Sequence, residues 1–438
     1  MSINPLRWTL SAQVIVALLS GILLGIFGGS DAYFYNLDNG DLGQIGLLII
    51  RLLKALAIPL ILFSILDTFL QTHIAARSGM RLVVICLTNV TVAFAIALTL
   101  MNGLKPGLDW RGEIDRLLAK LVTPEPSAAT GAKPSLDPLQ NLSGYIPHSL
   151  LDPLINNNVI AVVLLALLFG AALGSLKRHP PSDNALDLEP LAAMINAIHL
   201  LLIRTLHWVV RLVPLAVLCL VAQAVGKAGL GIFEQLAGYV GIITLGLCLH
   251  GLIYYPLAAW ALSGRSPREY LGKGLNAILA GLSTNSSLAT VPITLQCLKR
   301  MCVADGPARL AVCAGTNLNN DGVTLYEAMT ALFLAQALGF DLDIIQQMVI
   351  ILASLMAGVG IAGVPEAGLI VLPLVLNAAG LPDSVVVAAI PLVAPVDWFL
   401  ARVRSGVNVL SDLLVAILLD TWEKHSPTME QGNRPNSE

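Results

Sequence analysis

The side chains best suited to do chemistry in this sequence are charged and amide groups that fall inside apolar stretches. Arg404, Asn408 and Asp412 follow one another at intervals of four, so they lie on one face of a helix. A guanidinium can pair with a carboxylate through two hydrogen bonds, whereas carboxylate and amide oxygens are the ligands that a small hard cation such as sodium prefers. One helical face therefore offers an anion site and a cation site. The structural alternative is an internal ion pair between Arg404 and Asp397.

Three polar or glycine-rich interruptions divide the apolar C-terminal third of the chain: residues 283–287 (STNSS), 317–322 (NLNNDG) and 358–366 (GVGIAGVPE). Non-helical backbone at membrane depth is tolerated only where it is buried in protein or lines a watery cavity. A packing face of small residues between helices is the alternative explanation for any one of them. Because all three fall within about 85 residues, we interpret them as parts of one binding site.

The composition shows what must position these groups. Of 438 residues, 56% are hydrophobic and 12% are charged, against roughly 25% charged in an average soluble domain. The chain is therefore expected to lie in a lipid bilayer. Its formal charge of -3 excludes a surface that tracks nucleic-acid phosphates. The six cysteines are scattered without metal-ligand spacing, so neither a disulfide framework nor a zinc site is expected.

The apolar stretches predict an all-α membrane protein. A helix needs about 20 apolar residues to cross a bilayer, and six suitable stretches lie near residues 10–27, 42–71, 81–103, 153–176, 195–226 and 234–263. The first could also be the apolar part of a signal peptide, but the many later stretches favour an uncleaved span. The interrupted remainder predicts two re-entrant hairpins, each followed by a span. This gives eight transmembrane helices and the inverted repeat of a secondary transporter.

At its interruptions and last span, the sequence resembles the glutamate transporter family, the dicarboxylate/amino acid:cation symporters. The similar segments are residues 283–292 (STNSSLATVP), 319–327 (NNDGVTLYE), 363–369 (GVPEAGL) and 396–399 (VDWF) with Arg404, Asn408 and Asp412. Weaker similarity extends over nearly the whole chain. The resemblance implies a homotrimer with an elevator mechanism and no enzyme activity.

The family's organisation maps onto the chain as follows. Scaffold spans 1 and 2 take residues 1–80, span 3 of the transport domain takes 81–103, and an external loop takes 104–152. Scaffold spans 4 and 5 take 153–233, the rest of the transport domain takes 234–420, and a cytoplasmic tail takes 421–438. The short tails suit a bacterial inner membrane.

The same resemblance implies the ligands. No enzyme cofactor is expected, because sodium is co-transported. Its candidate ligands are Gly315, Asn317, Asn319, Asp321, Asn408 and Asp412, and span 3 contributes Thr88, Asn89 or Thr91 in a register that the sequence leaves open. The candidate substrate-binding residues are Ser286, Ser287, Val323, Gly363, Val364, Glu366, Ala401, Arg404 and Asn408.

Two departures from the family pattern bear on the substrate. Ala401 stands where the amino-acid transporters carry the acid that holds the substrate's ammonium group, and Val323 replaces a threonine. A buried ammonium without a counter-charge is costly, so an amine-free organic anion, a dicarboxylate in the first place, is the predicted substrate. The alternative is an acidic amino acid transporter in which Glu366 replaces the missing acid.

Glu327 occupies the position of the acid thought to move the coupled proton in mammalian relatives. Burial disfavours a charged carboxyl, which would let it take up a proton near neutral pH; a structural role for Glu327 is the alternative. Two functions of other classes are alternatives to symport. A passive anion channel would need a continuous polar pore, and an intramembrane serine hydrolase would need a base beside Ser283, Ser286 or Ser287, for which only His250 lies at membrane depth.

Overall fold

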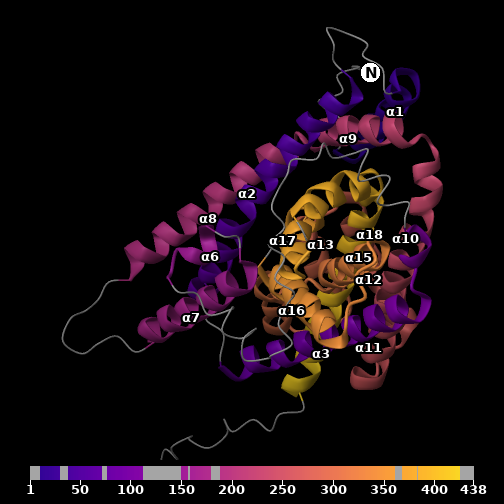
Figure 1. Ribbon diagram of the computed structural model, residues 1–438. Helices are drawn as coiled ribbons and strands as arrows, with labels where there is room; N and C mark the ends of the chain where they lie inside the picture. The colour runs from indigo at the N-terminus through magenta and orange to yellow at the C-terminus, as the bar shows by residue number, and fades with distance from the viewer. Residues whose placement is uncertain are drawn as a thin grey trace, which may run out of the picture.

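The computed structural model describes residues 10–29, 38–71, 76–111, 149–155, 158–178, 188–360, 367–381 and 383–424. Within these ranges every regular element is a helix, as the sequence predicts. The helices fall into two groups by their mutual packing (Figure 1).

The outer group comprises α1 (Leu10–Gly28), α2 (Asn39–Gln71), α7 (Val159–Arg178), α8 (Glu189–Val210) and α9 (Val213–Ala228). In this group α1 packs on α9, and α2 packs on α7, α8 and α9. Glycines allow the close approach of α1 to α9, since a Cβ at Gly21 would lie 2.7 Å from the carbonyl oxygen of Leu218. Small residues spaced by four are a common device for such contacts between apolar helices.

The inner group comprises α3 and everything from α10 onward, and its orange and yellow helices occupy the middle of Figure 1. Its bounds are α3 (Ala76–Leu104), α10 (Gly231–Cys248), the π-helical segment η3 (Leu249–Tyr254), α11 (Tyr255–Ser263), α12 (Pro267–Thr284), α13 (Ser287–Arg300), α14 (Asp305–Arg309), η4 (Leu310–Ala314), η5 (Gly315–Asn317), α15 (Asp321–Ala337), α16 (Ile344–Gly360), α17 (Ala367–Ala378) and α18 (Asp383–Lys424). The short elements η2 (Leu108–Trp110) and α6 (Asp152–Ile155) complete the described helices.

Two helix pairs stand where the sequence predicts hairpins. Helices α12 and α13 pack on each other, as do α16 and α17. Ser266 caps the start of α12, where its hydroxyl accepts a hydrogen bond from the Glu269 amide at 3.2 Å. Its end is Asn285 in the left-handed conformation, and Ser286 then caps α13. The tip of the second pair, residues 361–366, lies outside the described residues.

One helix boundary differs from the sequence-based expectation. The stretch 195–226 was expected to be a single span, but it belongs to two helices, α8 and α9, which meet at Arg211 and Leu212. Pro214 stands in the first turn of α9, where a missing backbone N–H costs nothing. Proline therefore favours the start of a new helix here over the continuation of the old one.

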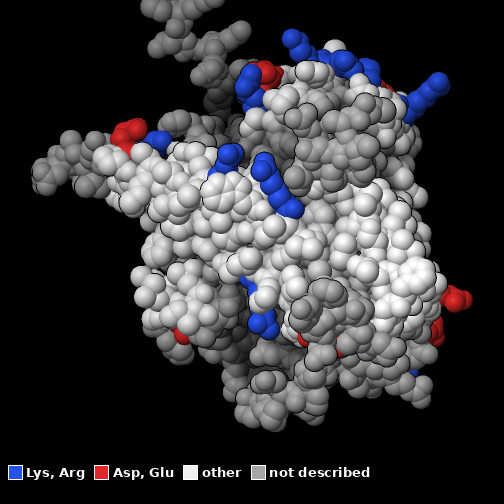
Figure 2. All heavy atoms as spheres, turned by 90° about the horizontal axis from the view of Figure 1, so that it is seen from above, with Lys and Arg blue, Asp and Glu red and all other residues white. Residues whose placement is uncertain are grey.

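Five stretches are long and apolar enough to cross a membrane: Asn39–Leu70, Ser78–Leu104, Ile160–Lys177, Glu189–Val210 and Leu236–Ser263. Shorter apolar helices lie in α1, α9, α16 and α17. Much of the described surface in Figure 2 carries no charged side chain. Large apolar side chains such as Leu168, Leu201 and Trp260 are exposed in the described part of the chain. Such a surface suits contact with lipid. The count of eight spans stays a prediction.

The centre of the inner group is unusually polar for a membrane protein. In α15 all residues from Asp321 to Ala335 are buried, so no side of this helix faces lipid. Helices α3, α10, α16, α17 and α18 pack around it. Buried polar groups of this kind require partners, and those partners define the candidate site.

Candidate functional site

Arg404 on α18 is held from three sides. Its Nη1 and Nη2 donate to the two carboxylate oxygens of Asp397 at 2.7 and 3.1 Å, and the guanidinium carbon lies 3.9 Å from the centre of the Tyr326 ring. The third side is Gly368 at the start of α17, where a Cβ would come within 2.4 Å of Nη1. The structural pair with Asp397 is therefore present, and it leaves three of the five guanidinium N–H groups for other acceptors.

The tip of the first helix pair contacts the same stretch of α18. The Ser405 hydroxyl donates to the Asn285 side-chain oxygen at 3.1 Å. Ser286, a predicted substrate ligand, uses its hydroxyl to accept the Ala289 amide at 3.2 Å as the cap of α13. The hydroxyl of Ser287 is buried and has no hydrogen-bond partner among the described residues. It is thus a polar group next to Arg404's helix that a ligand could satisfy.

Asp321 and Asp412 are two buried carboxylates, 2% and 1% exposed, held by neutral donors. Asp412 accepts hydrogen bonds from the Thr316 hydroxyl at 2.6 Å and from the Asn319 amide at 3.3 Å. Ser411 lies between the two acids, with its hydroxyl 2.8 Å from both the Asn319 side-chain oxygen and Asp321 Oδ2.

Neither carboxylate pairs with a Lys or Arg in the described part of the chain. The imidazole of His250 lies beside Asp321, with Nε2 3.7 Å from Oδ2. Two buried negative charges without a cation are expensive. The cluster therefore has the charge and the oxygen ligands of a cation site.

Asn408 and Asn320 connect this cluster to the Arg404 region. The Asn408 side-chain oxygen accepts the Gly322 amide at 2.8 Å, and its Nδ2 donates to Asn320 Oδ1 at 3.3 Å. Asn320 in turn donates to the Gly358 carbonyl at the end of α16, at 2.9 Å. The non-helical residues before α15 thus meet α16 and α18 at one place.

The structure answers which residue of span 3 faces the cation cluster. Asn89 is buried, and its Nδ2 lies 3.4 Å from the Ser411 hydroxyl. Thr88 and Thr91 are exposed and donate to carbonyls of their own helix, those of Val84 and Leu87. Of the three candidates only Asn89 reaches the cluster.

Glu327 lies two turns into α15 and is fully buried. Both of its carboxyl oxygens lack a hydrogen-bond partner among the described residues. A charged carboxylate buried without a hydrogen-bond donor is costly. The geometry is therefore compatible with a side chain that carries a proton.

The remaining predicted residues divide into two sets. Val323, Ala401 and Gly315 are buried at the centre of the inner group, and the Gly315 carbonyl accepts the Leu318 amide at 2.8 Å. Gly363, Val364 and Glu366 lie outside the described residues, and so does the side chain of Asn317. Their part in the site stays a prediction.

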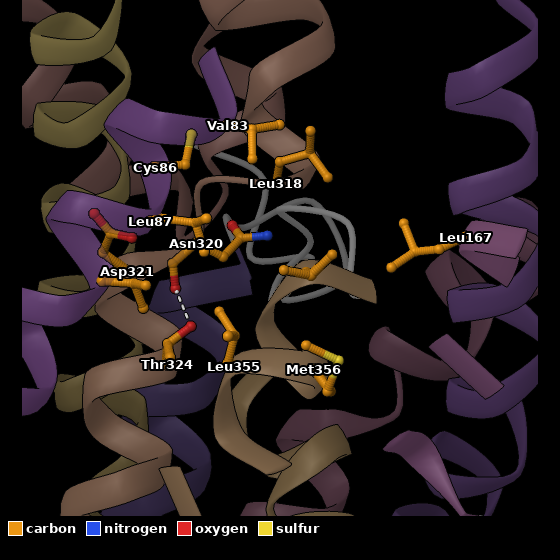
Figure 3. A pocket seen from close by; sticks show the side chains of 12 residues that line it. Val83, Cys86, Leu87, Leu167, Leu318, Asn320, Asp321, Thr324, Leu355 and Met356 are labelled. Atoms are coloured by element: carbon orange, nitrogen blue, oxygen red, sulfur yellow. Dashed lines mark hydrogen bonds between the residues drawn. The ribbon is translucent and has the colours of Figure 1, made fainter. Parts of the chain in front are cut away.

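A cavity of about 190 Å³ reaches the polar cluster from the side of the outer group. Figure 3 shows Asn320 and Asp321 at one end, Leu355 and Met356 of α16 along it, and Leu167 of α7 facing them across the space. Most of its lining is apolar. The cavity therefore separates the outer and inner groups beside the candidate cation site.

Several partners in the site were missed from the sequence. They are Thr316, Ser405 and Ser411, together with Tyr254 and Tyr255. Asn285 and Asn320 lie in two of the predicted interruptions, but neither was assigned an individual role from the sequence. Ser405 and Ser411 adjoin Arg404 and Asp412, and this adjacency is the signal that could have found them. The expected base of the hydrolase alternative, His250, lies beside Asp321 and its two neighbouring tyrosines.

Comparison with known proteins identifies relatives of this chain. A family model described as the sodium:dicarboxylate symporter family matches residues 10–422. Excitatory amino acid transporter 3 of Mus musculus is 27% identical over 93% of this chain and 84% of its own length. Excitatory amino acid transporter 1 of Ambystoma tigrinum is 27% identical over 89% of this chain and 79% of its own length. Excitatory amino acid transporter 1 of Mus musculus is 33% identical over 63% of this chain and 50% of its own length.

The family match covers nearly the whole chain and every element of the site described above. Its members are sodium-coupled membrane transporters, which have no enzyme activity and carry sodium as a co-transported ion. The protein belongs to the sodium:dicarboxylate symporter family, which includes the glutamate transporters.

Proposed function

We propose that this protein couples the inward movement of sodium to that of a small acidic solute with two carboxylates. One observation carries the proposal: Arg404 and the uncompensated Asp412 are both buried on one face of α18, two turns apart. An anion site and a cation site thus share one helix. A sodium ion at Asp412 would attract an anionic substrate at Arg404, two turns away on the same helix, so binding of the two ligands is cooperative.

The cation ligands in this proposal come from the two-carboxylate cluster. Asp412, Asn319, Asn408 and the Gly315 carbonyl supply one site, and Asp321 with Asn319 and Asn89 supplies a second. Asn317 contributes to a third with the backbone of the second hairpin. Oxygen ligands without thiols or imidazoles suit sodium.

The two candidate substrate classes differ in whether the substrate carries an amino group. Relatives named excitatory amino acid transporters favour an acidic amino acid, which is the reading that we place first. A dicarboxylate without an amine is the second candidate, and Ala401 is the specific observation that favours it. Ala401 is 1% exposed, and its methyl group cannot pair with an ammonium ion. In the first reading Glu366 holds the ammonium.

The experiment is uptake of labelled aspartate and of labelled succinate into proteoliposomes with an inward sodium gradient. Sodium-dependent, saturable accumulation of either solute is the expected result, and equal uptake in potassium would contradict symport. A channel would dissipate a solute gradient but could not accumulate the solute against one.

Ala401→Asp separates the two substrate classes, with Ala401→Asn as the control of equal size without charge. The added carboxylate should shift preference from succinate toward aspartate, because it attracts an ammonium and repels a second carboxylate. If the wild type already prefers aspartate, another residue holds the amine. Glu366→Gln should then weaken the uptake of aspartate and leave that of succinate unchanged.

The transport movement in this proposal is an elevator. The inner group, with the candidate site, moves against the outer group, which forms the contacts of a homotrimer. We assign the protein to a lipid bilayer, with a bacterial inner membrane as the expected location. Glu327 carries a coupled proton.

A further inference from the structure

Two adjacent tyrosines reach the candidate cation cluster from the junction of α10 and α11. The Tyr255 hydroxyl donates to Asp321 Oδ2 at 2.7 Å. The Tyr254 hydroxyl donates to the side-chain oxygen of Asn89 at 2.9 Å. These two hydrogen bonds connect one short segment to polar groups on α15 and α3. The ion-site assignments above do not use them.

The local helix geometry makes this double contact possible. Consecutive side chains of a regular α-helix point about 100° apart, so neighbours rarely serve one site. Residues Leu249–Tyr254 form a π-helical segment, whose wider turns occur frequently at functional sites. His250 within it is fully buried and packs on both tyrosine rings, with ring centres 5.2 Å from Tyr254 and 4.5 Å from Tyr255.

The position of Gly251 lets this segment approach α18. A Cβ there would lie 3.1 Å from a methyl group of Val407, which is tighter than ordinary contact. The aromatic trio of His250, Tyr254 and Tyr255 is therefore fixed both by its own stacking and by the helix behind it. Such rigid support is what a group needs to aim another side chain.

We propose that Tyr254 and Tyr255 are positioning residues that hold Asn89 and Asp321 in the orientation required to bind sodium. The inference rests on the proposed sodium coupling. Among the described residues, Asp321 receives its hydrogen bonds from Tyr255 and Ser411 at Oδ2, so Oδ1 is left to face a cation. Fixed ligand positions also set the size of the cation that fits, so the two tyrosines determine the preference for sodium over lithium.

The test uses Tyr255→Phe and Tyr254→Phe, which keep the rings and remove only the hydroxyls. Sodium and lithium are titrated against the thermal unfolding of the full-length protein in detergent. For Tyr255→Phe the expected result is a rise of about tenfold in the sodium concentration for half-maximal stabilisation, as loss of a hydrogen bond to a charged group implies. Tyr254→Phe should give a smaller rise in the same direction, because its partner Asn89 is neutral. The ratio of lithium to sodium affinity should move toward one, whereas unfolding without either ion should change little.

Tyr270→Phe is the matched control. Tyr270 is as fully buried as Tyr255, but its hydroxyl donates to the backbone carbonyl of Leu410, at 2.5 Å. Its loss should leave both ion affinities unchanged. If Tyr254→Phe and Tyr255→Phe behave like Tyr270→Phe in sodium and lithium, the tyrosines only pack and the inference is wrong.

A double-mutant cycle adds a readout that a packing role would not move. In the Asp321→Asn protein, which has no carboxylate to position, Tyr255→Phe should weaken sodium binding much less than it does in the wild type. Additive effects would contradict the proposal. If Asp321→Asn does not fold, the comparison with Tyr270→Phe decides alone. A wild type that shows no response to sodium would instead contradict the proposed function itself.

Discussion

At the scale of single residues, the uncompensated charge of Asp412 makes the sharpest prediction. Asp412→Asn keeps the shape of the side chain and removes a formal charge from the proposed sodium site. Sodium affinity should fall by about tenfold or more, because an interaction with a charged group is lost. Substrate affinity should fall with it, since linkage requires cooperative ligands to weaken together. Sodium-dependent thermal stabilisation and substrate binding measure the two effects.

Asp420→Asn is the control for this substitution. Asp420 is two turns farther along the same helix and is also buried, but it pairs with Lys424 at 2.7 Å and accepts the Ala304 amide at 3.2 Å. Its replacement should lower the unfolding temperature and leave sodium affinity unchanged. If Asp412→Asn responds to sodium at the same concentrations as the wild type, Asp412 is not a sodium ligand.

Glu327 makes a second prediction at this scale, on pH dependence. Its carboxyl group is fully buried without a described partner, so Glu327→Gln replaces a proton-carrying group by one that cannot titrate. Uptake should become less dependent on external pH, because a coupled proton no longer enters the cycle. Uptake measured between about pH 5.5 and 8.5, a range above the ordinary pKa of an exposed glutamate, tests this.

The control for Glu327 is Glu269→Gln. Glu269 stands in the first turn of α12 and pairs with Lys273 at 2.7 Å, with a third of its side chain exposed. The pH profile of this variant should match that of the wild type. If both variants keep the wild-type profile, Glu327 is a structural residue.

At the scale of elements, the approach of α17 to α18 depends on Gly368. A Cβ at this position would lie 2.4 to 2.7 Å from the guanidinium atoms of Arg404. In Gly368→Ala the end of a flexible side chain must move, whereas the backbone keeps its place. We therefore expect substrate affinity to fall while the sodium response and the unfolding temperature remain near those of the wild type.

Gly272→Ala on α12 is the matched control, because nothing lies within 4 Å of its added Cβ. Alanine should stabilise this helix by up to about 1 kcal/mol without changing substrate affinity. Equal substrate affinity in the two variants would show that α17 does not confine Arg404.

The helices also show which parts of the structure could be predicted from the sequence. Apolar stretches and their interruptions predicted the helices, the α12 and α13 tip and the buried face of α18, because each signal is local. The division between α8 and α9 was missed, since an apolar run hides a break between two apolar helices. The contact between Tyr255 and Asp321 joins residues 66 apart, and that between Asn89 and Ser411 joins residues 322 apart. No periodicity within one helix contains that information.

At the scale of the whole molecule, the two helix groups differ in what holds them together. The hydrogen bonds that build the candidate site join α3, η3, α11, the Asn285 cap of α12, α15, α16 and α18, which all belong to the inner group. Toward the outer group, the boundary includes the largely apolar cavity between α7 and α16. Polar contacts fix a geometry, whereas an apolar boundary can slide with less loss. This contrast is what an elevator movement requires.

A chemical bridge across that boundary tests the movement. Leu167 on α7 and Met356 on α16 line the same cavity (Figure 3), so cysteines at both positions can be joined by a short bifunctional thiol reagent. The six native cysteines are first replaced. In the elevator mechanism the bridge fixes the inner group against the outer group. Uptake should therefore stop, while sodium still raises the unfolding temperature, because the cation cluster itself is untouched.

The control bridge joins the same α16 to another helix of the inner group. The side chains of Gln347 and Asn102 on α3 are 2.7 Å apart, from Asn102 Nδ2 to Gln347 Oε1, so Gln347→Cys with Asn102→Cys accepts the same reagent. Both helices would travel together, and uptake should continue. Continued uptake with the bridge between Leu167→Cys and Met356→Cys in place would show that α7 and α16 do not move apart during transport. Arrest by both bridges would place the moving boundary inside the inner group, contrary to the assignment of α3 to it.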